Sequence, residues 1–367
     1  MIESNLTLKE VASLLKVSLS TVRRLVRRGE LQAFRIGTQG QMRVPESAVK
    51  RICGEPAQTP AEQEPAVQTI GQQHANEPQY MRVLSGTTQN DLSWSILNAD
   101  VNLALATLPE NSVNCIVTSP PYYWQRDYEV EGQIGHESTI ENYVQALVDV
   151  FARVRQTLTA DGTLFLNLGD TYYSAKGKPH GTDEKHNGRN MMRKHLRAVD
   201  GPGLGLPRKS LIGIPWRVAL ALQQEGWTLR SSVIWQRPAT LPEPTARDRP
   251  WRTHENVFIF SKGPKYYFNR AGLTGEEDIW KIVARPENPG SHFAPYPREL
   301  VDRCLACGCP EGGTVLDPFS GSGTTMVSAL NSGRKAIGIE LKPEYAEFSA
   351  MRIRKEFGEL PKTKALP

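Results

Sequence analysis

The stretch TVLDPFSGSGTTMVSALNSGRKAIGIEL, residues 314–341, decides the fold that this sequence predicts. Its first residues are apolar and predict a buried strand, SGSG permits a tight turn, and the segment that follows predicts a helix ending at a glycine. KAIGIEL predicts the next strand. We therefore expect a strand, a glycine-rich turn, a helix and a second strand, which is the βαβ unit of a parallel sheet.

Two glycines and an acid in this unit predict a nucleoside-binding site. Gly321 and Gly323 let a ligand approach the backbone closely, and Glu340 ends the second strand, where a carboxylate accepts hydrogen bonds from ribose hydroxyls. Met326 stands where a dinucleotide fingerprint has its third glycine. The pattern therefore argues against NAD and for a smaller adenosyl ligand.

Strands and helices alternate from Leu92 onward, the pattern of a doubly wound α/β sheet. Strands are expected at 93–100, 114–121, 162–170, 227–238 and 256–263, and helices at 102–109, 141–158, 214–226, 297–309 and 344–357. The second strand runs into TSPPYYWQRDY, residues 118–128, where two prolines end it because proline has no N–H for a sheet. Ser119 to Tyr122 should therefore lie at the carboxyl edge of the sheet, where ligands bind in this type of fold.

The two motifs together resemble a known family. TSPPY followed almost 200 residues later by DPFSGSGTT and then by an acid is similar to the amino-group DNA methyltransferases that use S-adenosylmethionine, in the β-type order with the catalytic motif before the cofactor motif. The resemblance covers about residues 86–355. It implies a doubly wound mixed sheet of the S-adenosylmethionine-dependent methyltransferase type, S-adenosylmethionine as cofactor and double-stranded DNA as partner.

The resemblance also implies which residues bind the cofactor. They are Asp100, Phe293, Asp317, Phe319, Gly321, Gly323, Thr324 and Glu340. In the family's arrangement Glu340 would hold the ribose, and Asp100 would lie near the adenine edge or its amino group. Phe293 and Pro295 belong to SHFAPYPREL, residues 291–300, which resembles the family's additional cofactor-pocket segment.

Ser119, Pro120, Pro121 and Tyr122 are the predicted catalytic residues. An exocyclic base amine is a poor nucleophile because its lone pair is delocalised into the ring, and acceptors at its two hydrogens favour a tetrahedral nitrogen. Ser119 Oγ and the Pro120 carbonyl are the expected acceptors, Pro121 rigidifies the turn, and Tyr122 offers a face for stacking on a flipped base. Tyr123 or Trp124 is expected to help hold that base or, alternatively, to be a core aromatic. No metal is required.

A serine before PPY favours cytosine N4 as the target, because Asp or Asn at that place is the usual adenine N6 pattern in this family. Adenine N6 methylation stays open as the alternative. An alternative of another class is a non-catalytic DNA-binding regulator that acts through the N-terminal module described next.

Residues 1–52 predict a winged helix-turn-helix domain. Thr7 and Glu10 are spaced as a capping box at the start of a first helix, and GTQG joins two short strands as a wing. Between them lies a second helix with a basic face made of Arg23, Arg24, Arg27 and Arg28. The unit resembles the modules of excisionases and MerR-type proteins, whose second helix enters the major groove. A docking module with an incidentally basic helix is the alternative.

The rest of the chain predicts a linker and a second DNA contact. Residues 53–85 are rich in Pro, Gln, Ala and Glu and predict a flexible linker, which leaves 86–367 for the methyltransferase domain. Residues 172–210 carry nine Lys or Arg against three acids and predict a DNA-recognition loop, together with residues 240–256. Asp170 is expected to line the target-base pocket; a long insertion with no role in specificity is the alternative for the loop.

Composition limits the remaining possibilities. The 367 residues contain no long apolar run and no signal-like N-terminus, so a cytoplasmic protein without a membrane span is expected. Five cysteines, three of them in CLACGC at 304–309, fit a reducing compartment and predict small buried side chains rather than a zinc site. The sequence leaves open a homodimer and a cognate restriction nuclease.

Overall fold

The chain divides into two compact units, Met1–Asn76 and Glu77–Pro367, which we describe separately. The structure, a computed structural model, describes residues 5–15, 17, 22, 25–26, 31–36, 41–52, 81–125, 130, 133–175, 198–201, 203–238, 246–273, 275, 277–284 and 296–360. Within these ranges no helix is long and apolar enough to cross a membrane.

The N-terminal unit is a small sheet with helices around one core. Its elements are β1 (Asn5–Thr7), α1 (Leu8–Leu14), β2 (Phe34–Ile36), β3 (Gln41–Pro45) and α3 (Glu46–Ile52), and the strands pair antiparallel in the order β1-β3-β2. The predicted capping box is confirmed, because the Thr7 N–H donates to Glu10 Oε2 at 2.7 Å and the Glu10 N–H donates to Thr7 Oγ1 at 3.2 Å.

Apolar side chains form the core of the N-terminal unit, which contains Val11, Val22, Leu31, Val44 and Val49. The antiparallel pairing of β2 with β3 confirms the predicted wing. The four arginines of the predicted DNA-contacting helix, Arg23, Arg24, Arg27 and Arg28, lie outside the described residues.

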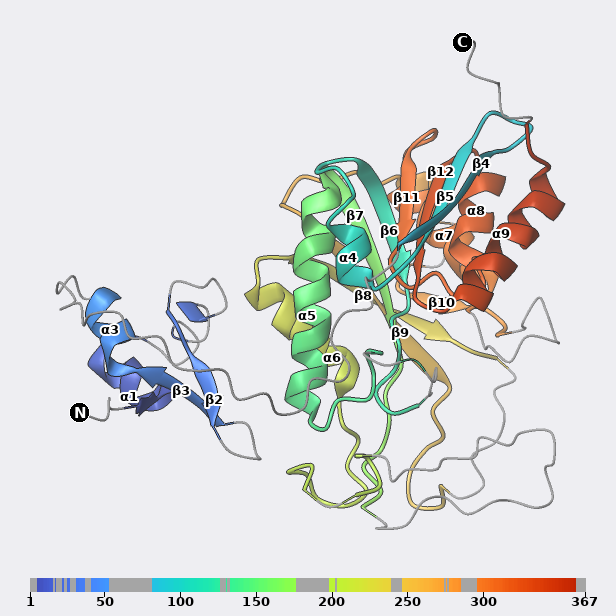
Figure 1. Cartoon of the computed structure of the whole chain (residues 1–367). Helices are drawn as coiled ribbons and strands as arrows, with labels where there is room; N and C mark the ends of the chain where they lie inside the picture. The colour runs from blue at the N-terminus through green and yellow to red at the C-terminus, as the bar shows by residue number, and fades with distance from the viewer. Residues whose placement is uncertain are drawn as a thin grey trace, which may run out of the picture. The chain divides into compact units, whose positions relative to one another are not determined.

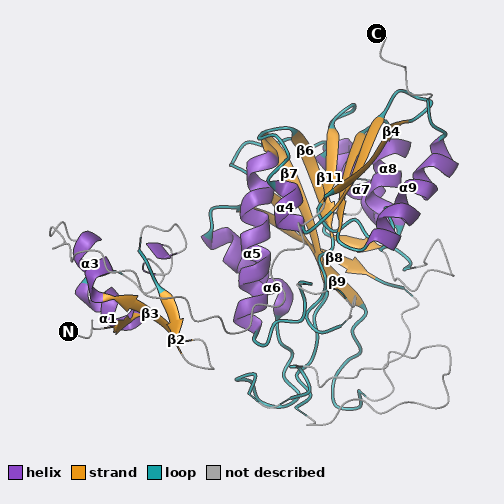
Figure 2. Ribbon diagram, viewed as in Figure 1, coloured by secondary structure: helices purple, strands orange, loops and turns teal. Residues whose placement is uncertain are grey.

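The larger unit is built on one nine-stranded sheet (Figures 1 and 2). Its strands are β4 (Arg82–Thr87), β5 (Ser93–Asn98), β6 (Val113–Thr118), β7 (Leu158–Leu168), β8 (Thr228–Gln236), β9 (His254–Ser261), β10 (Ile279–Lys281), β11 (Thr314–Asp317) and β12 (Lys335–Glu340). They lie in the order β10-β8-β9-β7-β6-β11-β12-β5-β4. The central pairs are parallel, whereas β4 and β9 run antiparallel to their neighbours, so the sheet is mixed as expected.

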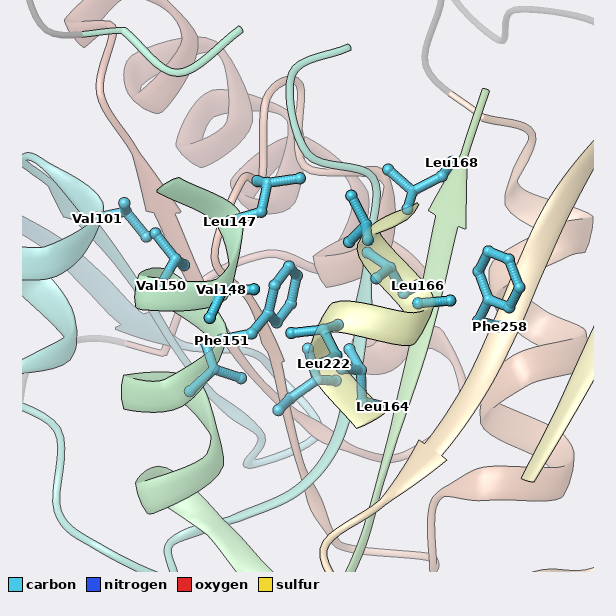
Figure 3. Close-up of a cluster of buried hydrophobic side chains, with 14 of the residues drawn as sticks. Val101, Leu147, Val148, Val150, Phe151, Leu164, Leu166, Leu168, Leu222 and Phe258 are labelled. Atoms are coloured by element: carbon cyan, nitrogen blue, oxygen red, sulfur yellow. The ribbon is translucent and has the colours of Figure 1, made fainter. Parts of the chain in front are cut away.

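Helices cover both faces of this sheet, which confirms the doubly wound α/β class (Figure 2). They are α4 (Val101–Leu105), α5 (Ile140–Thr157), α6 (Ile214–Gln224), α7 (Arg298–Gly308), α8 (Thr324–Asn331) and α9 (Pro343–Phe357). On one face α4, α5 and α6 bury side chains such as Phe151 and Leu222 in one cluster with Leu164 of β7 (Figure 3). On the other face α7, α8 and α9 pack against β6, β11 and β12, among other strands.

The sequence missed the outermost strands. Residues 82–85 were predicted as the end of the linker, but they form the first part of β4, which pairs antiparallel with β5 along its whole length. Leu84 is the only buried residue of β4, so the strand has little apolar alternation to recognise, and the pairing with β5 stabilises it. The remaining linker, 53–80, lies outside the described residues.

Candidate active site

The two predicted motifs meet at the centre of the sheet. β6 and β11 are parallel neighbours, and the chain continues from them in opposite directions, to β7 on one side and to β12 on the other. Such a switch point leaves a crevice at the carboxyl edge of the sheet. The loops after the two strands, 119–122 and 318–322, line one cavity of about 380 Å³.

Most of the predicted cofactor residues lie on one side of this cavity. Its wall includes Asp100, Phe319, Gly321, Thr324 and Glu340. Of the other three, Asp317 and Gly323 do not line the cavity, and Phe293 lies outside the described residues, as does Pro295. Tyr296, from the same predicted segment, lines the cavity.

Glu340 and Gly321 are joined directly. The Gly321 N–H donates to Glu340 Oε2 at 2.9 Å, and the Lys342 N–H donates to Oε1 at 2.8 Å. Burial raises the pKa of Glu340 to about 7, although both backbone hydrogen bonds oppose this. Gly321 has φ of 50°, which favours glycine, and a Cβ at Gly321 would meet no atom within 4 Å. The cavity wall therefore offers a carboxylate acceptor, Glu340, beside an open backbone turn at Gly321. These two features fit the ribose of an adenosyl ligand and the chain attached to that ribose.

Asp100 begins α4 at the same wall. Its Oδ1 accepts hydrogen bonds from the backbone N–H groups of Asn102 at 2.9 Å and Leu103 at 3.2 Å, as an N-cap does. The carboxylate is thus fixed in place at the cavity by the start of a helix.

Asp317 supports the site from behind rather than lining it. Its Oδ1 accepts from Thr118 Oγ1 at 2.7 Å and from the Phe319 N–H at 3.0 Å, while its Oδ2 accepts from Tyr296 at 2.9 Å and Thr325 at 2.7 Å. Burial raises its pKa. Gly323 is the N-cap of α8 with φ of 79°, and a Cβ there would collide with Ser349. Both residues therefore shape the turn and are not exposed to the ligand.

The predicted catalytic residues, Ser119, Pro120, Pro121 and Tyr122, all line the cavity. The Pro121 carbonyl accepts a hydrogen bond from Tyr143 of α5 at 2.8 Å. No described residue donates to the Pro120 carbonyl oxygen. Two adjacent acceptors, Ser119 Oγ and the Pro120 carbonyl, are thus presented at the end of β6.

Two aromatic residues and one acid near this loop have roles that the sequence left open or assigned differently. Tyr123 is 1 % exposed and packs 5.2 Å from the Tyr143 ring, so it is a core aromatic and not a base contact. Trp124 stacks on His136 at 4.4 Å between ring centroids and donates to the Glu137 carbonyl. Asp170 caps α6 by accepting from the N–H groups of Gly213 and Ile214, and it does not line the cavity.

Sequence reasoning missed a polar group on the opposite side of the cavity. Asn167 at the end of β7, Arg237 after β8 and Glu255 in β9 join Tyr122 in the wall. They are far apart in the sequence, and only the antiparallel return of β9 between β7 and β8 brings them together. The single cavity therefore has a cofactor-type side and a second polar side, with Ser119 between them.

Parts of the two predicted DNA-recognition loops lie side by side next to this cavity. The Arg249 guanidinium carbon lies 3.8 Å from the centroid of the Tyr172 ring, and that of Arg252 lies 5.7 Å away. Arg252 and Gln125, a cavity residue, both donate to the Asp170 carbonyl. Trp251 is 48 % exposed. Residues 176–197, 202 and 240–245 of these loops lie outside the described part of the chain.

The cysteines of CLACGC lie in the interior. Cys304, Cys307 and Cys309 are buried and unpaired, as is Cys115, and burial raises the pKa of Cys307 to about 12. In the described ranges no group of three or more His, Cys, Asp or Glu residues is placed to hold a metal ion. These thiols therefore act as small apolar side chains.

Comparison with known proteins gives two family matches. Residues 113–352 match the model of a DNA methylase family, and residues 6–52 match a helix-turn-helix domain. The Type II methyltransferase M.SmaI of Serratia marcescens is 43 % identical over 272 residues, which cover 71 % of this chain and 91 % of that protein. The Type II methyltransferase M.Cfr9I of Citrobacter freundii is 40 % identical over 271 residues, covering 71 % and 88 %.

A solved structure shares the fold. It is the PvuII DNA methyltransferase (cytosine-N4-specific), with a TM-score of 0.55 and 23 % sequence identity, over 76 % of this chain and 89 % of that one. The match confirms the layered mixed sheet.

Proposed function

Because this chain belongs to the DNA methylase family, we propose that it methylates the N4 amine of cytosine in double-stranded DNA at the cavity beside Ser119. Membership of the family makes it an S-adenosylmethionine-dependent DNA methyltransferase of the N4 or N6 class. The choice of base and the roles of individual residues are the proposal.

The observation that carries the proposal is the single cavity that joins the Glu340 side to the Ser119 loop. When bound, S-adenosylmethionine supplies a methyl group on a positively charged sulfur. Glu340 and the Gly321 turn would hold its ribose, and Asp100 would contact its adenine edge or its amino group. The reacting amine would then lie at Ser119.

The Ser119 loop would activate the amine by accepting its hydrogens. Ser119 Oγ and the Pro120 carbonyl are two neighbouring acceptors, and two hydrogen bonds to the amine favour a tetrahedral nitrogen whose lone pair is directed at the methyl group. The target base must leave the duplex to reach them, and the Tyr122 ring offers it a stacking surface. No step requires a cysteine nucleophile.

Two features support cytosine over adenine. The first is the serine at position 119, which resembles the N4 pattern. The second is Arg237 on the far side of the cavity, whose guanidinium donors suit the carbonyl oxygen O2 of cytosine, since adenine carries no carbonyl oxygen. Adenine N6 is the alternative product.

We place DNA over the joined loops around Tyr172, Arg249 and Trp251, since arginine and exposed aromatics suit phosphates and bases. The helix-turn-helix domain would add a second contact through Arg23, Arg24, Arg27 and Arg28. Because the relatives are named Type II methyltransferases, we further propose a role as the modification half of a restriction pair. The cytoplasm is the compartment proposed for it. Light scattering would test whether the protein forms the homodimer that the sequence leaves open.

The product base tests the proposal. Purified protein is incubated with unmethylated DNA and S-adenosylmethionine, and the DNA is digested to nucleosides for mass spectrometry. N4-methylcytosine is the expected product. N6-methyladenine would overturn the base assignment, and neither product on varied DNA would favour a non-catalytic regulator.

A further inference from the structure

Four polar side chains from four separate segments form one hydrogen-bonded group in the cavity wall. Tyr122 OH lies 2.6 Å from Glu255 Oε2, and Asn167 Nδ2 lies 3.0 Å from both of these oxygens. Arg237 binds the other carboxylate oxygen of Glu255, Oε1, at 3.0 Å. The Glu255 side chain is 13 % exposed, so this group is largely shielded from water.

The direction of each hydrogen bond in this group follows from chemistry. A carboxylate only accepts, so the single hydroxyl hydrogen of Tyr122 points to Glu255. The phenol oxygen can then only accept from its other neighbours, Asn167 Nδ2 at 3.0 Å and Ser119 Oγ at 3.2 Å. Burial and Glu255 raise the pKa of Tyr122 well above 10, which keeps this hydrogen on the phenol.

The directions of these hydrogen bonds determine where the hydroxyl hydrogen of Ser119 points. A serine hydroxyl has one hydrogen and two lone pairs, and here the hydrogen is directed at Tyr122. The lone pairs of Ser119 Oγ are left for a ligand in the cavity. A serine oriented in the opposite sense would point its hydrogen at the amine hydrogens and repel them.

We propose that Glu255 is a positioning residue for methyl transfer, which acts through Tyr122 to keep Ser119 Oγ an acceptor for the target amine. This inference rests on the proposed role of Ser119. Arg237 holds Glu255 at the opposite oxygen, so the carboxylate stays aimed at Tyr122. Glu255 itself need not touch the base.

The isosteric change Glu255→Gln should reverse the direction of the hydrogen bonds that run from Ser119 through Tyr122 to residue 255. The charged Arg237 competes best for the one remaining oxygen of the amide, which turns the amide NH2 toward Tyr122. Tyr122 then accepts from Gln and donates to Ser119, whose own hydrogen is turned toward the amine. Misdirected acceptors of this kind slow a reaction by about 10- to 100-fold.

The test is the single-turnover rate of methyl transfer to DNA from a methylation-deficient host, with full-length protein. We expect Glu255→Gln and Tyr122→Phe each to slow transfer by at least about tenfold, with an unchanged dissociation constant for S-adenosylmethionine. The double variant should be no slower than Tyr122→Phe, because without the phenol hydroxyl Glu255 has no connection to Ser119. The matched control is Glu311→Gln, because Glu311 is exposed and lies just before β11, at the edge of the sheet opposite the cavity.

The outcomes separate this inference from the proposed function. If the wild type and Glu311→Gln transfer no methyl group, the proposed function fails. If these two proteins transfer the methyl group and Glu255→Gln is equally fast, Glu255 does not act through Tyr122. The same conclusion follows if the rate losses of Glu255→Gln and Tyr122→Phe multiply in the double variant. Should Glu255→Gln not fold, a wild-type rate in Tyr122→Phe alone would overturn the inference.

Discussion

Thr118 Oγ1 lies 2.7 Å from Asp317 Oδ1, so the last residue of β6 is hydrogen-bonded to the last residue of β11. These two residues stand immediately before the two motifs, and both are buried. The bond therefore fixes the distance between the Ser119 loop and the Gly321 turn at the place where the chain changes direction in the sheet.

Removing the Asp317 carboxylate should loosen both motifs. Asp317→Ala leaves the Thr118 hydroxyl and the Phe319 N–H without their acceptor, and each buried donor left unsatisfied costs about 1–3 kcal/mol. We expect a lower free energy of unfolding in urea and weaker binding of S-adenosylmethionine. Asp149→Ala, exposed on α5, is the control, and equal stability of the two variants would contradict this role.

Loss of the Tyr122 ring should affect turnover and spare the cofactor. Tyr122→Ala removes the hydroxyl and also the proposed stacking surface, which is worth about 1–3 kcal/mol per base, so methylation should be one to two orders of magnitude slower than in Tyr122→Phe. Calorimetry with S-adenosylmethionine should give the wild-type dissociation constant. Normal turnover in this variant would exclude Tyr122 from binding the base.

Binding of the adenosyl group should depend on pH through Glu340. The pKa of this carboxyl is about 7 in the folded protein against an ordinary 4.5, and the ionised form is the stronger acceptor for ribose hydroxyls. The affinity for 5′-methylthioadenosine, which has the ribose but no amino acid, should rise about tenfold between about pH 6 and pH 8. The Glu340→Gln variant should bind weakly at both values, and a pH-independent wild type would refute the role.

Glu340 should also make the stability of the ligand-free protein fall as pH rises. A carboxyl with a raised pKa binds its proton more tightly in the folded than in the unfolded chain, so ligand-free protein should lose stability as pH rises from 4.5 to about 7. Urea unfolding of the wild type and Glu340→Gln isolates this contribution, because only the wild type carries it.

Arg249 should contribute a phosphate contact. Arg249→Gln is expected to weaken DNA binding across sequences and to lower the slope of log affinity against log salt by about one. Fluorescence anisotropy at several salt concentrations measures both. Arg153→Gln, exposed near the end of α5, should leave the slope unchanged.

The helix-turn-helix domain should raise the affinity for DNA without taking part in methyl transfer. A chain that lacks residues 1–52 should bind DNA at least about tenfold more weakly, because linking two binding modules raises their joint affinity. Its rate at saturating DNA should remain that of the full chain. An unchanged affinity and sequence preference would remove the proposed role of this domain.

Local patterns predicted much of the site because they were continuous in the sequence. The βαβ unit around Gly321, the proline-terminated strand before Ser119 and the Thr7 capping box each depend on neighbours within a few turns or residues. The predictions that differ from the structure concern side chains whose direction depends on distant partners. Asp170, expected at the target-base pocket, faces the start of α6, while the contact of Tyr123 with Tyr143 of α5 decides between the two roles left open for Tyr123.

The sequence by itself determined the doubly wound α/β class, the order of the two motifs and Glu340 at the end of β12, since hydrophobic periodicity and turn chemistry act over short distances. Only the tertiary structure decided that Asn167, Arg237 and Glu255 share a cavity with Ser119. Their meeting depends on β9 lying antiparallel between β7 and β8, a pairing between residues up to 98 positions apart, as for Thr163 and Ser261, that no local pattern encodes.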